Sequence, residues 1–174
     1  MISSGIAVGL NWVPGVRPLE PFVTFNFAVE VEGLLVGGFS EVSGLEGELE
    51  TESYREGGVN GFIHRLPTVA SSGTLTLRHG LTALSTLWNW YDETVSGVVR
   101  RRNGTIMLLD RRQIPVMWWN FRNALPVRWT GPTFDARSGE VGFEAVELAH
   151  EGLTKPLLSQ AAALAYEAAR LAGQ

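Results

Sequence analysis

Between Val23 and Leu148 the chain is a series of short alternating segments separated by turn residues. Apolar side chains occupy every second position from Val23 to Val31, as a half-buried β-strand requires. Further short segments rich in β-branched and aromatic residues are predicted to be strands: Thr74–Arg78, Thr105–Leu109, Pro115–Phe121, Val127–Trp129 and Val141–Leu148. Turn pairs such as Asn103-Gly104 and Ser138-Gly139 separate them. Because the β–α alternation of a parallel sheet is missing, we predict a mainly β fold, an antiparallel β-sandwich or small barrel with one flanking helix.

The flanking helix is predicted where the spacing of apolar residues changes from every second position to every third or fourth position. The residues that recur at three- and four-residue steps are Leu84, Leu87, Trp88, Tyr91 and Val95. Thr82 is suited to the N-cap of this helix. Gly97 is suited to the position just after its end, which favours glycine.

An Ala-rich segment after Gly152 is predicted to form a second helix. Its apolar stripe comprises Leu157, Leu158, Ala161, Leu164, Ala165, Ala168 and Leu171. A helix of about 15 residues is marginal in water, so this stripe is expected to pack against another surface. That surface is either a groove on its own domain or a partner.

Composition limits the domain organisation and the functional classes. The chain has 174 residues, 45% of them hydrophobic, which suffices for one core and excludes a disordered chain. We predict a β-barrel domain over 22–153, preceded by an irregular Gly/Pro-punctuated arm over 1–21 and followed by a helical extension over 154–174. Met1–Val16 has neither a basic start nor the roughly 20 apolar residues of a membrane span. We therefore expect the protein to be made and assembled in the cytoplasm.

Motifs for catalysis, cofactors or metals are missing from the sequence. Without cysteine there is no disulfide or Cys-ligated metal site, and the net charge of −4 gives no basic field for nucleic acid. No phosphate-binding loop, nucleophile elbow or dinucleotide fingerprint occurs. The histidines His64, His79 and His150 lack the spacing of metal ligands, and the carboxylates Asp110 and Asp135 have no spacing that indicates acid–base catalysis. We predict a protein that is not an enzyme, with no cofactor, no metal and no specific nucleic-acid partner.

Charges are concentrated in two places. Strand geometry would place Glu46, Glu48, Glu50 and Glu52 on one face, where like charges repel unless water or a basic partner screens them. The basic concentration consists of Arg100, Arg101, Arg102, Arg111 and Arg112. It is either a solvated loop face or a contact for an acidic partner. A protein with one acidic and one basic edge can bind copies of itself in rings or filaments, and such association weakens as salt rises.

The positions of two adjacent tryptophans leave open what covers the strand that carries them. Alternation places Trp118 and Trp119 on opposite faces of one strand, so a one-sided core cannot bury both. The second face is covered either by the flanking helix or by a neighbouring subunit. The alternative function is a monomeric β-sandwich module that binds carbohydrate or another ligand on exposed indoles, for which the candidates are Trp88, Trp90, Trp118, Trp119 and Trp129.

A composite motif connects the chain to a known family. The first part of the motif consists of Trp119, Asn120, Phe121, Asn123, Ala124, Pro126, Trp129, Gly131 and Pro132. Its second, C-terminal part consists of Glu147, Leu148, Ala149, His150, Glu151 and Gly152. Together they closely resemble the C-terminal half of the tail tube proteins of contractile phage tails and of related extracellular contractile injection systems. The segments PFVTFNFAVEVEG and GGFSEVSGLE resemble the opening strand pair of that family, and RLPTVASSGTLTLRHGL leading into WNWYDE resembles its middle strand and helix. The resemblance covers Pro21–Leu153.

The resemblance implies a barrel that forms six-membered rings, which stack into a rigid tube inside a contractile sheath and on a baseplate. Sheath contraction would drive this tube through a target membrane, with cargo in the lumen. By analogy, Glu48–Gly61 is an extended hairpin that reaches the next copy, and its expected contact residues are Glu48, Glu50, Glu52, Tyr54, Arg55 and Glu56. The family contributes no catalytic residues.

The two terminal extensions depart from the family pattern. The C-terminal stripe either covers a groove on its own body or binds a sheath, cargo or baseplate-hub component. If the stripe binds such a component, the protein could be a tube initiator instead of the repeated tube subunit. The particle itself is either a virion tail or an injection system.

Overall fold

The computed structural model describes residues 22–32, 38–58, 61–81, 85–137, 139 and 141–172. Its elements follow in chain order: β1 Phe27–Val31, β2 Phe39–Ser43, β3 Gly47–Tyr54, β4 His64–Ser72, β5 Thr74–Gly80, α1 Thr86–Val95, β6 Arg102–Leu109, β7 Pro115–Thr130, β8 Phe143–Ala149, β9 Leu153–Thr154 and α2 Leu157–Ala172. This is the predicted class, mainly antiparallel β with one flanking helix and a C-terminal helix. None of the described helices is long and apolar enough to cross a bilayer.

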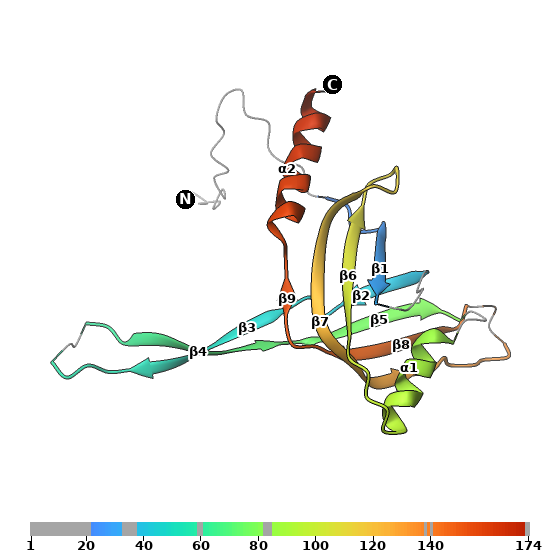
Figure 1. The fold of residues 1–174 in the computed structure, drawn as a ribbon, viewed down its shortest axis with the longest axis horizontal. Helices are drawn as coiled ribbons and strands as arrows, with labels where there is room; N and C mark the ends of the chain where they lie inside the picture. The colour runs from blue at the N-terminus through green and yellow to red at the C-terminus, as the bar shows by residue number, and fades with distance from the viewer. Residues whose placement is uncertain are drawn as a thin grey trace, which may run out of the picture.

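Strand β7 joins the two halves of the β structure. The strand order is β1-β6-β7-β8-β5-β2, and β9 also pairs with β7. The first half of β7 pairs with β6 and β9, whereas its second half pairs with β8. In Figure 1, β1, β6 and the first half of β7 run across the direction of β2, β5 and β8. The core fills the angle between these two groups of strands, and its buried residues are Val29, Val31, Leu75, Leu77, Leu87, Trp90, Ile106, Phe121, Ala124, Val146 and Leu148.

Strand β7 is longer than predicted. The two predicted strands Pro115–Phe121 and Val127–Trp129 are one continuous strand. Asn123 bends it with a left-handed φ of 51°, and the register with β8 shifts between Pro126 and Arg128. The residues between the two predicted strands therefore bend the chain without interrupting the pairing.

Three other predicted boundaries are wrong. Strand β1 begins at Phe27, not at Val23: β6 ends at Leu109, whose N–H still binds the Asn26 carbonyl at 2.9 Å, and it offers no partner strand to the residues before Asn26. Gly104 is not in a turn: it lies inside β6, opposite Phe121. A Cβ there would come within 2.2 Å of the Phe121 ring, so only glycine fits. Strand β8 begins at Phe143 in place of Val141, and Ser138 of the second predicted turn lies outside the described residues.

Helix α1 packs its apolar side against the barrel. Leu87 and Trp90 are buried, and the Trp90 indole donates a hydrogen bond to the Arg100 carbonyl at 2.8 Å. Gly97 follows the helix with a φ of 91°, as predicted. The N-cap is Ser85, whereas the predicted N-cap Thr82 and the first stripe residue Leu84 lie outside the described residues.

Helix α2 packs with the side opposite to its predicted stripe. It stands beside β7 in Figure 1 and contacts that strand through buried Ser159 and Ala163. The stripe residues Leu157, Leu158 and Leu164 face solvent, with exposed fractions of 81%, 74% and 64%. The helix itself was predicted correctly, and of the two surfaces left open for its stripe, a groove on its own domain is excluded for these leucines.

Candidate assembly interface

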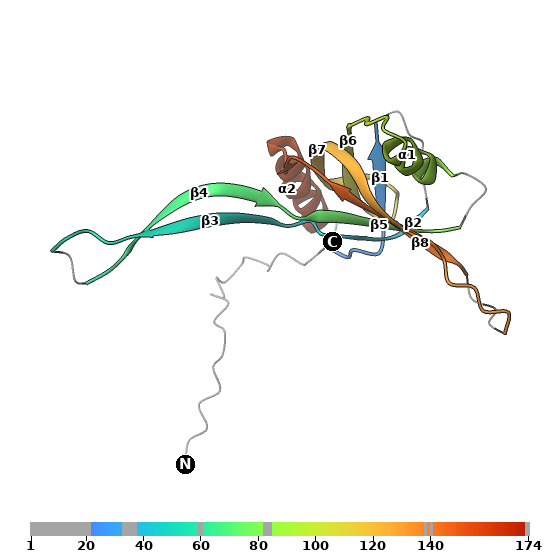
Figure 2. The ribbon, with the colours of Figure 1, turned by 90° about the horizontal axis from the view of Figure 1, so that it is seen from below.

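The β3–β4 hairpin projects from the body as a continuation of the β2–β5 pair. Figure 2 shows both strands extending well beyond the rest of the chain. Two glycines hold its base. Gly44 has a left-handed φ of 81° and lies against the Thr74 carbonyl, where a Cβ would come within 2.0 Å. Gly73 lies beneath the Glu46 side chain, and the hairpin therefore leaves the body in a fixed direction.

The hairpin carries its carboxylates on β3, whereas β4 contributes the basic Arg65. Every residue of β3 is exposed. Cross-strand register places Glu48 opposite Ser71 and Glu52 opposite Leu66. The register shift between Leu49 and Thr51 adds its extra residue on β4, so β3 keeps its alternation. Among the described residues, Glu48, Glu50 and Glu52 have no basic partner.

Apolar side chains are also exposed along the hairpin. These are Leu49, Tyr54, Phe62, Ile63, Leu66 and Val69. The other predicted hairpin residues lie near its tip: Glu56 forms an ion pair with His64 at 3.4 Å, and Arg55 is exposed. An isolated two-stranded hairpin is marginal in water, and an uncovered apolar surface of this kind marks a protein contact.

The five predicted basic residues do not form one edge. Arg100, Arg101 and Arg102 precede or begin β6, whereas Arg111 and Arg112 follow its other end. The first group is engaged within the chain: Arg101 pairs with Glu151 at 2.6 Å, and Arg102 donates to the Glu32 carbonyl at 2.7 Å.

The second basic group sits on a tight turn. The Asp110 carboxylate accepts the backbone N–H groups of Arg112 at 2.7 Å and of Ile114 at 2.9 Å. Arg111 and Arg112 are exposed, and neither has an acidic partner among the described residues. Within the part of the chain that the structure describes, they are thus the members of the predicted basic edge whose charge is uncompensated.

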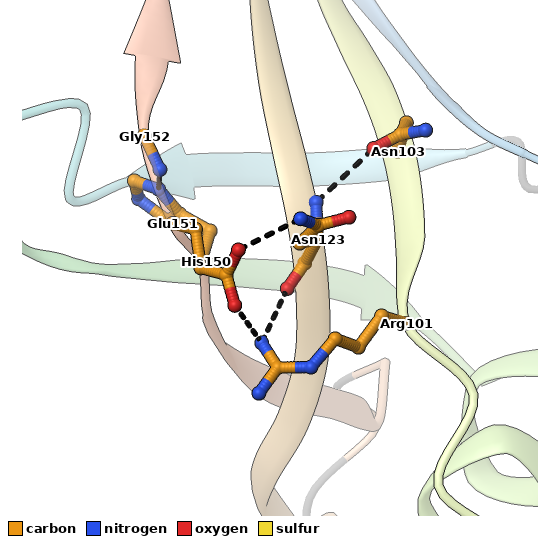
Figure 3. Close-up of polar contacts among 6 residues, drawn as sticks. All are labelled: Arg101, Asn103, Asn123, His150, Glu151 and Gly152. Carbon is orange, nitrogen blue, oxygen red and sulfur yellow. Dashed lines mark hydrogen bonds and ion pairs between the residues drawn. The ribbon is translucent and has the colours of Figure 1, made fainter.

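A polar clamp holds the bend of β7. Asn123 donates its amide to Glu151 Oε2 at 2.7 Å, and Arg101 Nη1 contacts both Glu151 Oε1 and the Asn123 carbonyl (Figure 3). The Asn103 side chain accepts the Asn123 backbone N–H at 3.1 Å. The residues after β8 are thereby fixed to the bend.

His150 lies beside the clamp, next to Glu151 and Gly152. Gly152 N–H donates to His150 Nδ1 at 3.3 Å, which requires that nitrogen to be unprotonated (Figure 3). Burial lowers the pKa of His150 from its usual 6.5, because the low-dielectric surroundings disfavour the imidazolium. In its neutral form, His150 thus ties Gly152 to the end of β8.

The composite motif lies in β7 and the residues just after it. Phe121, Ala124 and Pro126 are buried, whereas Trp119 is half-buried beneath the Lys155 ammonium, 5.5 Å from its ring centre. The Asn120 side chain accepts a hydrogen bond from the Thr105 hydroxyl at 3.2 Å. Gly131 lies against the Trp129 ring and Pro132 follows it, so the motif residues organise the interior and the bend.

One polar network had no sequence signal. His79 and Glu144 are both buried, with His79 Nε2 2.9 Å from Glu144 Oε1. The Trp129 indole donates to Glu144 Oε2 at 3.0 Å, and Trp129 contacts Trp88 edge-to-face. His79, Trp129 and Glu144 lie on β5, β7 and β8 and Trp88 lies on α1, so only the topology brings them together.

The other candidate sites are dispersed. Trp90 is 1% exposed and cannot serve as a stacking platform. Asp110 and Asp135 each accept backbone N–H groups of their own turns. No three His, Asp or Glu side chains of the described residues converge in a way that would hold a metal.

Residues 23–154 match the family model of the T4-like virus tail tube protein gp19. The chain belongs to this tail tube protein family. The resemblance predicted from the composite motif is thus confirmed over nearly the same residues. Tail tube proteins are structural subunits and not enzymes. Helix α2 lies beyond the matched residues.

Solved structures agree with the family match. A chain of the anti-feeding prophage baseplate is 30% identical, with a TM-score of 0.69 over 78% of this chain and 95% of that chain. A chain of the sheath–tube complex of the PVC extracellular contractile injection system is 28% identical, with a TM-score of 0.71 over 78% and 91%. Hcp1 from Flavobacterium johnsoniae shares the fold, at 18% identity and a TM-score of 0.51 over 74% and 92%. No curated protein sequence matches the chain significantly.

Proposed function

We propose that this tail tube protein forms six-membered rings that stack into the rigid inner tube of a contractile tail or injection apparatus. Sheath contraction would drive this tube through a target membrane. Solved chains with 28% and 30% identity come from a sheath–tube complex and from a six-fold symmetrised baseplate. These relatives support the sheath, baseplate components and copies of the same chain as its partners in a phage-tail-like particle.

The uncovered β3–β4 hairpin is the observation that carries this proposal. It exposes apolar side chains together with unpaired carboxylates, and it extends away from its own domain (Figure 2). A surface used once by each copy against a different surface of the next makes a heterologous contact, which closes into rings or continues as filaments. A subunit whose hairpin surface is covered only by another copy can build a tube by repeating this contact.

Helix α2 supplies a second outward surface. Its stripe of exposed leucines lies outside the residues matched by the family model. We propose that this stripe does not take part in the contacts between tube subunits. It binds a sheath, baseplate-hub or cargo component instead. A tube-initiating role is compatible with such a contact.

Electron microscopy and sedimentation of the purified full chain, alone and coexpressed with its sheath, test the proposed assembly. We expect rings of six copies and stacked tubes, with association that weakens as salt rises because charged edges contribute to it. Compact monomers under every condition, including coexpression, would contradict the proposal.

A hairpin variant and a matched control sharpen this test. Replacing Leu49 and Val69 by serine removes exposed apolar surface from the hairpin and should suppress ring formation. Phe134→Ser removes a still more exposed apolar side chain from a loop outside the hairpin and should leave ring formation unchanged. Equal effects of both changes would argue against a specific role of the hairpin.

A further inference from the structure

We infer that a groove between α2 and the β6–β7 turn receives the acidic face of the β3–β4 hairpin of a second copy. This groove has a volume of about 760 Å³. Three segments line it: the start of the described chain at Phe22, the turn from Leu109 to Val116, and the C-terminal half of α2. The inference rests on the proposed self-assembly and identifies the surface that accepts the hairpin.

The groove combines an apolar floor with a basic rim. Val116 is buried at its base, and Tyr166 of α2 packs against Phe22 with their ring centres 5.9 Å apart. Arg111 and Arg112 stand on the turn at the rim. Their guanidinium groups have no acidic partner among the described residues, because the neighbouring Asp110 carboxylate is occupied by backbone N–H groups. A ligand with apolar side chains and carboxylates complements such a groove.

The acidic face of the hairpin has this chemistry. Directly opposite residues of an antiparallel pair share a face, so Leu66 lies on the same face as Glu52, and Glu48 and Glu50 alternate onto it. Leu66 is half exposed, and the three carboxylates lack basic partners among the described residues. Apolar surface and negative charge thus occur together on the hairpin, as apolar surface and positive charge do in the groove.

A second groove among the described residues does not suit the hairpin. It has a volume of about 1280 Å³, and the carboxylates of Glu41, Asp135 and Glu144 line it against a single guanidinium, that of Arg78. Arg78 is already paired with Glu41 at 3.5 Å. An acidic strand would meet like charges there, which destabilises the encounter.

The hairpin cannot fill the groove of its own chain. Figure 1 shows the hairpin leaving the body beside the lower end of β9, whereas α2 and the β6–β7 turn stand at the far end of the long strands. The hairpin base is fixed by Gly44 and Gly73, so it does not fold back. The contact is therefore between copies, and because its two halves differ it repeats from one copy to the next.

Charge reversal tests the pairing directly. The double substitution Arg111→Glu with Arg112→Glu should raise the concentration needed for half-assembly about tenfold or more, and so should Glu50→Arg with Glu52→Arg. In the chain that carries all four substitutions, the concentration needed for half-assembly should return to within about threefold of the wild-type value. The positive and negative charges are then exchanged between hairpin and groove, so they attract again. Arg128→Glu with Arg137→Glu is the control of equal charge change at exposed sites outside the groove and should leave assembly unchanged. Circular dichroism verifies that each variant folds.

The outcomes separate this inference from the proposed function. If the wild type assembles and the hairpin reversal blocks assembly while the arginine reversal does not, the hairpin binds another surface and the inference fails, although the proposed function stands. Loss of assembly in both reversals without rescue in the fourfold variant also overturns the pairing. If the wild type never assembles, the proposed function itself fails.

An engineered disulfide gives a second measurement. The chain has no cysteine, so a chain with Glu50→Cys and Arg112→Cys can form intermolecular disulfides only through the new thiols. We expect a ladder of reducible oligomers up to the ring. Chains with a single cysteine should give dimers at most, and a double variant that assembles without the ladder would overturn the contact.

Discussion

The Ser159 hydroxyl of α2 binds both backbone groups of Trp118 in β7. Its oxygen lies 2.8 Å from the Trp118 nitrogen and 2.9 Å from the Trp118 carbonyl oxygen. Strand β9 pairs with β7 at Asn120 and Phe121, next to this point. A single serine thus continues the hydrogen bonding that β9 begins and closes the edge of β7 against further strands.

Removing the Ser159 hydroxyl should destabilise the fold. Ser159→Ala leaves the N–H and C=O groups of Trp118 without these partners, and Ser159 is fully buried, so we expect a loss of about 1–3 kcal/mol in the free energy of unfolding. Urea denaturation measures this loss. Ser53→Ala, the same change at an exposed site on β3, is the control and should shift stability by less than about 0.5 kcal/mol. A Ser159→Ala protein as stable as the wild type would show that the edge bond contributes nothing.

Gly104 should tolerate no side chain. A Cβ would lie 2.2 Å from Phe121 Cζ and 2.5 Å from the Glu30 carbonyl oxygen, so Gly104→Ala must displace a buried ring or a neighbouring strand. We expect a loss of about 3 kcal/mol or more. Gly57→Ala, where a Cβ meets open space, should be nearly neutral in the same thermal unfolding experiment. Similar melting temperatures for the two variants would contradict the close packing of β1, β6 and β7.

Asn123 combines a left-handed backbone with a side-chain contact, and two substitutions separate them. Asn123→Gly keeps the φ of 51° accessible but loses the bond to Glu151, which should cost about 1 kcal/mol. Asn123→Ala loses the bond and also strains the backbone, which should cost about 1 kcal/mol more. Equal stability of the two variants in urea would mean that the bend does not hold this residue in its left-handed conformation.

Much of the architecture can be predicted from residue patterns. Strands that pair over their full length, such as β5 and β8, show the alternation that identifies them. Where a partner strand ends, the pattern misleads: Val23 and Phe25 continue the alternation of β1, but β6 provides no backbone beside them. Sequence patterns show the alternation of a segment but not the length of its neighbour.

The direction in which α2 packs could not be predicted for a different reason. Its buried side includes the polar residues Ser159 and Glu167, and the leucines lie on the other side. Periodicity assigns the most apolar stripe to the core, whereas here a specific hydrogen bond to β7 and small alanines decide the contact. The separation of the five arginines, by contrast, follows from an element that was predicted, because the strand over Thr105–Leu109 lies between the two groups and β6 places them at its opposite ends.

Protonation of His150 should lower stability below neutral pH. Its pKa is lower in the folded protein than in the unfolded chain, so the unfolded chain binds more protons as the pH falls below about 6.5. The contribution of His150 is thus complete above this pH and declines on acidification until the folded-state pKa is reached. We expect the melting temperature to fall between pH 7.5 and 5.5 by more in the wild type than in His150→Asn, whose amide oxygen can accept the Gly152 N–H without titrating. Parallel pH profiles for the two proteins would exclude His150 as the source of the decline.

Two adjacent residues of α2 test which side of this helix packs. Ala163 is buried and Leu164 is 64% exposed, so the same replacement at the two positions changes helix propensity little but meets different surroundings. Ala163→Gln places a polar side chain against β7 and should cost about 2 kcal/mol or more in the free energy of unfolding of the single chain. Leu164→Gln should change it by less than about 0.5 kcal/mol, because this leucine contributes no buried surface until a partner covers it. Urea denaturation at low protein concentration, where copies stay apart, provides both values. The reverse order of effects would mean that the leucine stripe packs on the domain, and the outward surface assigned to a sheath, hub or cargo component would then not exist.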